Sequence, residues 1–309
     1  MSAGTTAPAA GPDGPSTTDA PGLTLSADPS PVGSESRLGV QLDRTLTWLD
    51  LLGDQLSFYA RALAWTPRAI RRYSREVLRL LSDVAFGSGA LALIGGTVGV
   101  MIGMTLFTGT VVGLQGYAAL NQIGASAFTG FVSAYFNTRE IAPLVAGLAL
   151  SATVGAGFTA QLGSMRINEE IDALEGMGVP SLPYLVTTRI IAGAVAVIPL
   201  YALGLVSSYV GSRLVTVDFE GQSAGTYDHY FGLFLSPVDV LWSFLKVLIF
   251  SVVVIGVHCY YGYRARGGPA GVGVAVGRAV RTAIVMINVI DFLMSLAIWG
   301  ATTTVRIAG

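Results

Sequence analysis

The sequence predicts an all-α integral membrane protein with about five transmembrane helices. Three observations lead to this fold class. Of the 309 residues, 52% are hydrophobic and only 12% are charged, whereas soluble domains carry about 25% charged residues. No Asp, Glu, Lys or Arg occurs from Val84 to Thr138. Apolar runs of about 20 residues, the length that crosses a roughly 30 Å hydrocarbon layer, recur along the chain.

The N-terminal segment has a different composition. Residues 1–36 are rich in Pro, Ala, Gly, Ser and Thr and contain no Lys or Arg. Such a segment buries too little apolar surface to offset its ordering entropy, so we expect a disordered tail. It lacks the basic stretch followed by an apolar stretch that marks a signal peptide. We therefore expect the N-terminus to lie in the cytoplasm.

Residues 37–82 show the two-faced pattern of amphipathic interfacial helices. Thr66-Pro67 is typical of a helix N-cap followed by a first-turn proline. The next residues form a basic stripe of Arg68, Arg72, Arg75 and Arg79 and an apolar stripe of Ile70, Val77, Leu80 and Leu81. This pattern predicts a helix over 67–81 in the membrane interface, where each base gains about 1 kcal/mol from anionic headgroups. Alternatively, these bases only set the topology under the positive-inside rule.

Five membrane spans are expected from the apolar runs. They lie near 84–113, 141–163, 187–212, 239–262 and 282–304. Residues 117–138 are long enough for a sixth span, and the arginines decide the number. With a cytoplasmic N-terminus, a sixth span would place Arg166, Arg264, Arg266, Arg278 and Arg281 outside. We therefore expect 117–138 to be a shallow or re-entrant segment on the outer side, sheltered by protein.

Small residues recur at every fourth position in the first two expected spans. They are Gly95, Gly99 and Gly103 in the first span and Gly147, Ser151, Gly155, Thr159 and Gly163 in the second. Stripes of small residues let helix backbones approach closely. They predict tight helix packing without naming the partner helix.

An acidic cluster interrupts the apolar sequence between the second and third spans. In MRINEEIDALEGMGV, residues 165–179, Asn168 is a plausible N-cap and Gly176 or Gly178 a plausible helix end. One side carries Ile167, Ile171 and Leu174, and another carries Glu169, Asp172 and Glu175. The pattern predicts a short cytoplasmic amphipathic helix that another protein binds. A solvated surface helix is the alternative.

Two charged residues lie inside expected spans. Lys246 and Asp291 are costly in lipid and are therefore candidate functional residues. We expect them to pair and to fix the fourth span against the fifth. In the alternative, Lys246 extends toward the outer interface while Asp291 bonds hydroxyl or backbone groups. Arg139 and Glu140 begin the second span, and because adjacent helix residues do not face each other, we expect their partners elsewhere.

The sequence offers no motif for catalysis, metal binding or nucleotide binding. Lys246 is the only lysine and no GxxxxGK[ST] motif surrounds it, so the chain has no P-loop. His229 and His258 make no metal set, and we expect both to be structural. Cys259 is expected to be a packed thiol. No cofactor is therefore expected in this chain, and any ATP would bind a partner protein.

Two long stretches resemble a known family. Residues 139–193 read REIAPLVAGLALSATVGAGFTAQLGSMRINEEIDALEGMGVPSLPYLVTTRIIAG, and residues 271–300 read GVGVAVGRAVRTAIVMINVIDFLMSLAIWG. Both resemble the MlaE/YrbE family, the permease subunits of Mla and Mce lipid-transport ABC systems, and the resemblance covers roughly 84–304. The stretches GQSAGTYDHYF (221–231) and HCYYGYRARGGPAGVG (258–273) are similar to the B-type YrbE subunit of actinobacterial Mce systems.

The resemblance implies a function and a set of partners. Residues 83–309 would form a permease domain in the bacterial inner membrane that moves a phospholipid, fatty acid or sterol. The implied partners are an ABC ATPase dimer that holds ATP and Mg, a homologous A-type YrbE permease, MCE-domain proteins outside and membrane lipids, with no nucleic acid. The implied coupling helix carries Arg166, Glu169, Glu170, Asp172 and Glu175, with Glu170 where the Mla-type pattern has Gln.

Two other functions fit part of the sequence. A lipid transporter or flippase driven by an ion gradient would use intramembrane ionisable residues, for which Lys246 and Asp291 are the candidates. A membrane scaffold without transport would leave the acidic helix unexplained.

Overall fold

The computed structural model describes residues 53–86 and 96–300, and all regular structure in these ranges is helical. Five of the helices there are long and apolar enough to cross a membrane. They are Thr97–Gln122, Ser126–Ile167, Leu182–Phe219, Pro237–Tyr263 and Gly268–Trp299. The predicted all-α membrane fold with five spans is therefore confirmed. The expected disorder of residues 1–36 lies outside the described residues.

The first span and the segment after it differ from the expectation. The helix α5 (Thr97–Gln122) begins well after residue 84. After a turn at Gly124, where φ is 72°, the 3-10 helix η1 (Ser126–Phe128) and α6 (Thr129–Phe136) begin the second span. The prediction of a separate shallow or re-entrant segment over 117–138 is therefore wrong. Most of its residues extend two long helices, whose backbone polar groups are paired within the helix and need no other shelter.

The second and third spans are each built from several helical pieces. The second continues through the π-helix η2 (Asn137–Ile141), α7 (Ala142–Leu150), the π-helix η3 (Ser151–Gly155) and α8 (Ala156–Ile167). The third consists of the π-helix η4 (Leu182–Thr187), α10 (Thr188–Leu214) and the π-helix η5 (Val215–Phe219). Such π-turns are rare and are frequent at functional sites. Here η2 contains both Arg139 and Glu140.

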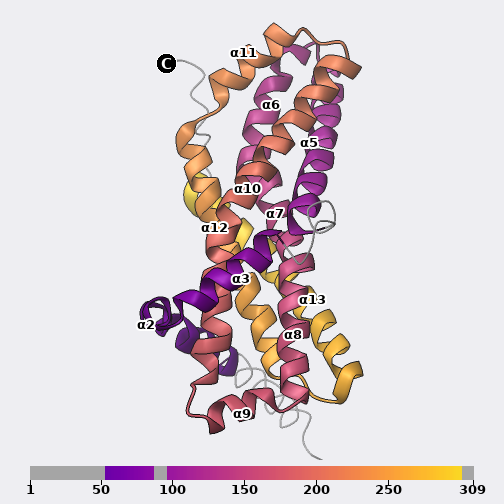
Figure 1. Cartoon of the computed structure of the whole chain (residues 1–309). Helices are drawn as coiled ribbons and strands as arrows, with labels where there is room; N and C mark the ends of the chain where they lie inside the picture. Colours follow the sequence, from indigo (N-terminus) through magenta and orange to yellow (C-terminus); the bar gives the residue numbers. More distant parts are fainter. Residues whose placement is uncertain (1–52, 87–95, 301–309) are drawn as a thin grey trace, which may run out of the picture. The chain divides into compact units, whose positions relative to one another are not determined.

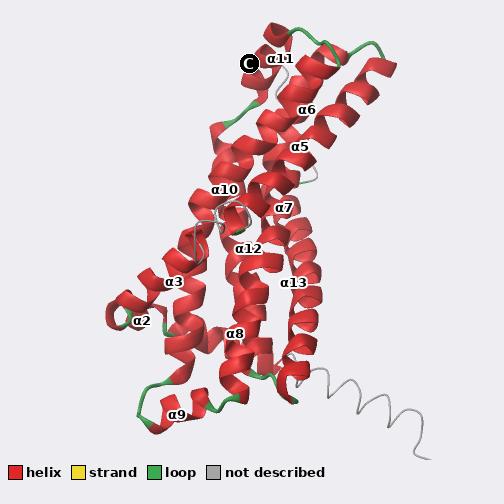
Figure 2. Cartoon of the chain, turned by 45° about the vertical axis from the view of Figure 1, so that its right-hand side comes forward, coloured by secondary structure: helices red, strands yellow, loops and turns green. Residues whose placement is uncertain are grey.

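The short helices α9 (Glu170–Gly176) and α11 (Ala224–Phe234) lie at opposite ends of the helix bundle (Figure 1 and Figure 2). The turn at Gly124 belongs to the α11 end, because Gln222 Nε2 donates a hydrogen bond of 2.8 Å to the carbonyl oxygen of Ser126. At the same end, Arg213 of α10 pairs with Asp228 of α11 at 2.8 Å. The hydrogen bond from Arg213 holds the pKa of the Asp228 carboxyl below its ordinary value.

The helices α5 and α10 pack with their backbones close together. A Cβ atom at Gly109 would overlap the carbonyl oxygen of Ser208, and a Cβ atom at Gly211 would overlap that of Leu106. By contrast, a Cβ atom at Gly103 would have nothing within 4 Å. Gly95 lies outside the described residues. The close approach is therefore made one to two turns beyond the glycine stripe that the sequence suggested for the first span.

The small residues of the second span face α12 (Pro237–Tyr263) and α13 (Gly268–Trp299). A Cβ atom at Gly155 would lie 2.5 Å from His258 Cδ2, and one at Gly163 would lie 2.9 Å from Val272 Cγ1. The tight packing predicted for this stripe is confirmed. His258 and Cys259 are both fully buried, as expected for structural residues.

The helices before the first span begin and break differently from the prediction. The chain is helical over 53–64, in α2 (Thr66–Arg72) and in α3 (Ser74–Phe86). Trp65 occupies the N-cap and Thr66 is already helical, so the predicted N-cap is wrong by one residue. The helix expected over 67–81 is interrupted at Tyr73, whose ring packs edge-on against Tyr184 with centroids 5.3 Å apart.

The basic stripe of these helices is exposed. Arg68, Arg72, Arg75 and Arg79 are all exposed side chains. Of the apolar stripe, Leu80 is buried, Val77 and Leu81 are half-buried, and Ile70 is 50% exposed. The apolar face is therefore only partly covered by the bundle, because the break at Tyr73 separates Ile70 from the rest. An interfacial position in the membrane stays a prediction.

Candidate functional site

The acidic helix α9 lies between the second and third spans. Its Ile171 is fully buried and Leu174 is half-buried against the bundle, whereas the acids of the opposite side are exposed. The predicted N-cap at Asn168 is wrong: Asn168 ends α8, and Glu169 caps α9 in the left-handed region with a φ of 59°. Reversing the chain between two helices within two residues requires this conformation, which costs a non-glycine residue about 1–2 kcal/mol. Such strain is often found at functional sites.

The acids of α9 fall into two groups. Asp172 pairs with Arg166 at the end of α8, with 2.7 Å between Oδ1 and Nη1. Glu175 accepts hydrogen bonds from the Ser181 hydroxyl and, at 3.3 Å, from the Tyr263 hydroxyl at the end of α12. Among the described residues, Glu169 and Glu170 have no such partner and are exposed. Two of the predicted coupling acids therefore anchor α9, while the other two face outward.

A second cluster of predicted residues surrounds Lys246, in the interior of the bundle. The side chain of Lys246 is fully buried, and its Nζ atom lies 2.7 Å from Asp291 Oδ1 and 3.2 Å from Glu140 Oε2. The same nitrogen donates to Ser295 Oγ at 2.7 Å and to the carbonyl oxygen of Arg139 at 2.9 Å. The structure thus shows the expected pair of Lys246 and Asp291, and it adds Glu140 from the second span. Three spans meet at one ammonium group.

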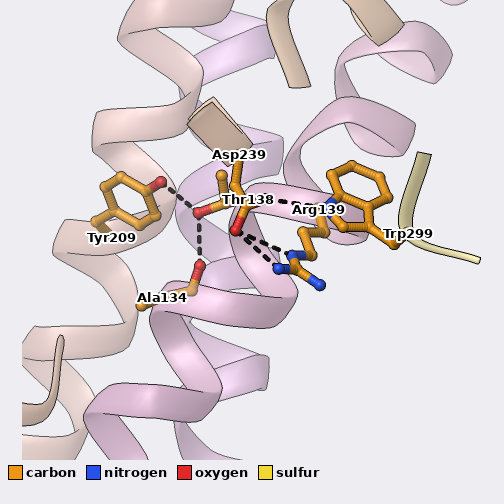
Figure 3. Close-up of polar contacts among 6 residues, drawn as sticks. All are labelled: Ala134, Thr138, Arg139, Tyr209, Asp239 and Trp299. Atoms are coloured by element: carbon orange, nitrogen blue, oxygen red, sulfur yellow. Dashed lines mark hydrogen bonds and ion pairs between the residues drawn. The ribbon is translucent and has the colours of Figure 1, made fainter. Parts of the chain in front are cut away.

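Arg139 faces a different set of partners (Figure 3). Its Nη2 and Nε atoms donate to Asp239 Oδ2 at 2.8 and 3.2 Å. Trp299 Nε1 donates to the other oxygen of Asp239 at 2.9 Å, and the guanidinium also lies over the rings of Tyr135 and Trp299. Thr138, the residue before Arg139, contacts α10 instead: its hydroxyl oxygen lies 2.6 Å from that of Tyr209. As expected, the partners of Arg139 and Glu140 lie elsewhere in the chain, on α12 and α13.

Sequence reasoning missed Asp239, Ser295 and Trp299. Asp239 lies in the first turn of α12, where the helix dipole favours any acidic residue, so its position alone does not indicate a partner. Asp291, Ser295 and Trp299 follow one another at four-residue steps and therefore share one face of α13. That spacing was the available signal that the intramembrane Asp291 belongs to a longer polar face.

Within the described ranges, no group of three or more His, Cys, Asp or Glu residues is placed to hold a metal ion. His258 instead lies between the hydroxyls of Ser151 and Thr159. The Lys246 cluster joins three spans, and α9 leaves Glu169 and Glu170 exposed.

Several known proteins that this chain resembles are described as permeases. A family model described as Permease MlaE matches residues 86–297, which contain α9 and the predicted residues Arg139, Glu140, Lys246 and Asp291. A probable ABC transporter permease protein of Rickettsia bellii is 32% identical over 191 residues, or 62% of this chain and 74% of that protein. The intermembrane phospholipid transport system permease protein MlaE of Haemophilus influenzae is 30% identical over 197 residues, or 63% and 76% of the two chains.

A plant relative is more distant. The protein TRIGALACTOSYLDIACYLGLYCEROL 1, chloroplastic, of Arabidopsis thaliana is 27% identical over 223 residues, or 71% of this chain and 64% of that protein. The family match covers more than half of the chain and includes all five candidate spans except the last two residues of α13. The chain belongs to the MlaE permease family.

Proposed function

We propose that this chain is the membrane-embedded permease subunit of an ABC-type lipid transporter. Relatives named as an ABC transporter permease and as a phospholipid transport permease support the proposal. The observation that carries it is α9, an exposed acidic helix that is anchored to the spans through Ile171, Asp172 and Glu175. Because the chain has no P-loop, the energy of ATP must reach it through contact with another protein.

The α9 helix is the site at which we place the separate ATPase. Glu169 and Glu170 are exposed, so their carboxylates can form ion pairs with a basic surface of that partner. The anchoring residues of the same helix would pass a displacement of α9 to the second and fourth spans. A nucleotide-dependent movement of the ATPase would then shift the permease between two packings of its helices.

The transported molecule is proposed to be a lipid of the phospholipid class. The large apolar residues Phe107, Leu241 and Phe292 lie exposed on three different spans, which suits contact with acyl chains or with a second permease. The resemblance to B-type YrbE subunits favours a pair with an A-type YrbE chain, an ABC ATPase dimer on the cytoplasmic side and MCE-domain proteins outside. This arrangement has α9 and the N-terminus in the cytoplasm of a bacterial cell. An ion-gradient mechanism has less support, because Lys246 and Asp291, its candidate residues, form an ion pair with each other.

Co-purification tests the proposal. The tagged full-length chain, purified from its own host in mild detergent, is expected to bring down an ABC ATPase with a Walker motif. The double substitution Glu169→Lys and Glu170→Lys should sharply reduce ATPase recovery while leaving membrane insertion unchanged, because both side chains are exposed and take no part in anchoring α9. Glu175 is a less suitable target, because its carboxylate bonds Ser181 and Tyr263.

The matched control is Glu220→Lys. Glu220 is also an exposed acid, but it follows η5 at the α11 end of the bundle. ATPase recovery should be normal with this variant. Equal recovery with the double variant and the control would rule out α9 as the docking site, and reproducible absence of any ATPase from the wild-type preparation would rule out the function.

A further inference from the structure

His258 forms a buried polar cross-link between the second and fourth spans. Its Nε2 atom lies 3.0 Å from Ser151 Oγ, and its Nδ1 atom lies 2.8 Å from Thr159 Oγ1. The Thr159 hydroxyl also lies 3.0 Å from the carbonyl oxygen of His258. An uncharged imidazole has one donor and one acceptor nitrogen, and a hydroxyl can serve as either. Both nitrogens are therefore satisfied in a site that is closed to solvent and lipid, and the cross-link fixes the register of the two helices.

The backbones of these helices are also close on both sides of the ring. A Cβ atom at Gly155 would lie 2.5 Å from His258 Cδ2, and a Cβ atom at Gly262 would lie 2.8 Å from the carbonyl oxygen of Thr159. Real side chains essentially never approach that closely, so the second span, at Gly155 of η3 and Thr159 of α8, cannot slide past the end of α12 without a rearrangement. The interface around His258 is rigid in both its polar and its steric contacts.

The same two helices hold both ends of α9. The start of α9 is tied to α8 by the ion pair of Arg166 and Asp172. Its end is tied to α12 by Glu175, whose carboxylate bonds the hydroxyl of Tyr263, the last residue of that helix. Since Thr159 lies eight residues before the end of α8, the His258 cross-link is about 12 Å from α9 along the helix. The contacts therefore close a ring that runs through α8, α9 and the last turns of α12.

We propose that His258 is a positioning residue that makes α8, α9 and residues 258–263 move as one rigid body, here named the coupling block. The inference rests on the proposed function, because it concerns how a movement of the ATPase reaches the spans. With the cross-link in place, a displacement of α9 moves the second and fourth spans together. Through Ser151, the first residue of the π-helix η3, His258 also holds the turn of helix that precedes the block in the second span.

Loss of the cross-link should separate ATP use from transport. Without His258, α8 can follow α9 while α12 stays behind, so the ATPase would still bind and hydrolyse ATP but move less lipid for each ATP. A residue that only stabilises the fold would lower the two activities together, in proportion to the amount of folded complex. The ratio of lipid moved to ATP hydrolysed therefore distinguishes positioning from simple stabilisation.

The first test measures the rigidity of the block without using transport. Spin labels are attached at Ser164→Cys on α8 and Arg266→Cys after α12, both exposed positions, in a Cys259→Ala background of the complex purified with its ATPase. The distance between the labels should be narrowly distributed and equal in the nucleotide-free and ATP-trapped states. In His258→Leu it should broaden or change with nucleotide. In His258→Gln, which keeps a donor and an acceptor, it should return toward the wild-type distribution.

The matched control is Tyr261→Phe. It removes the 3.1 Å hydrogen bond to Thr282, which joins the same part of α12 to α13 outside the coupling block. In proteoliposomes with a fluorescent phospholipid, this variant should move as much lipid per ATP as the wild type, whereas His258→Leu should show a several-fold lower ratio with hydrolysis retained. A wild-type ratio together with an unchanged, narrow label distance in His258→Leu overturns the inference.

Other outcomes are also decisive. If His258→Leu does not assemble, Thr159→Val removes the hydroxyl through which α8 bonds His258, and an unchanged label distance in that variant counts against the coupling block. If the wild-type chain brings down no ATPase, the proposed function fails instead. The two failures are thus distinguishable, because the label distance can be read in the permease alone.

Discussion

At the scale of single residues, burial separates the charges that join helices from those that face outward. Lys246 is fully buried and is surrounded by Glu140, Asp291 and Ser295 from two other spans. Glu169 and Glu170 are exposed at the end of the bundle. A charge buried at membrane depth has no water to replace a lost partner, so each of its contacts is needed. Exposed charges are instead available to a second protein.

The Lys246 cluster gives a prediction about stability. The substitution Lys246→Met removes the ammonium group and leaves two carboxylates without their shared partner. Breaking a buried ion pair in this way costs about 3–5 kcal/mol in proteins where it has been measured. We expect a large fall in the melting temperature of the detergent-purified protein and a loss of yield.

Arg213→Gln is the matched control for that prediction. It also removes one partner of an ion pair, but the Arg213 and Asp228 side chains are 46% and 51% exposed. Exposed pairs contribute about 0–1 kcal/mol, so the melting temperature should change little. Equal losses from the two substitutions would contradict the buried arrangement of Lys246.

At the scale of the helices, close packing depends on a few glycines whose neighbours are backbone atoms. The helix α5 meets α10 at Gly109, where the neighbouring atom is a carbonyl oxygen, whereas Gly103 of the same helix meets nothing within 4 Å. A backbone atom cannot move away from an added methyl group as the end of a flexible side chain can. The two glycines therefore predict opposite responses to the same added methyl group.

Gly109→Ala and Gly103→Ala form a matched pair of substitutions in one helix. Overpacking of this kind costs about 1–3 kcal/mol, so Gly109→Ala should lower the melting temperature. Gly103→Ala should be neutral or stabilising, because Ala in a helix interior is favoured over Gly by about 0.5–1 kcal/mol. Thermal unfolding of the two purified variants measures the difference. A loss at Gly103 as large as that at Gly109 would show that Gly103 contacts another chain.

At the scale of the whole molecule, five spans place the α9 end and the α11 end on opposite sides of the membrane. The segment with α9 joins the second and third spans, and the turn at Gly124 joins the first and second. Consecutive connections of a multispan protein lie on alternate sides. The proposed function requires the α9 side to be cytoplasmic.

Cysteine labelling tests this topology. In a Cys259→Ala background, Met177→Cys after α9 and Ile123→Cys near the turn are suitable positions, because the native side chains are 71% and 75% exposed. A membrane-impermeant maleimide should label Ile123→Cys in intact cells and Met177→Cys only after permeabilisation. Labelling of both from outside would contradict five spans, and labelling of Met177→Cys alone from outside would contradict a cytoplasmic ATPase site.

Local patterns in the sequence were sufficient for the fold class, for five spans and for the two sides of α9. The fold class and the two sides of α9 rest on hydrophobicity and helical periodicity, which are properties of neighbouring residues, and the number of spans also needed the distribution of arginines between the loops. Ile171 and Leu174 therefore lie on the inner side of α9 as the spacing predicts, and the acids lie on the other. Helix ends were less predictable, since Asn168, Thr66 and Tyr73 depend on how the chain turns between packed elements.

Only the tertiary structure decided which residues meet. Arg139 donates to Asp239, which lies a hundred positions away in the sequence. Glu140 joins the ion pair of Lys246 and Asp291, two residues for which the sequence analysis predicted only a pair with each other. His258 lies against Gly155 because the second span and α12 pack at one particular register. The register between packed helices is set by the shapes of side chains on both surfaces, and no local pattern in either helix contains that information.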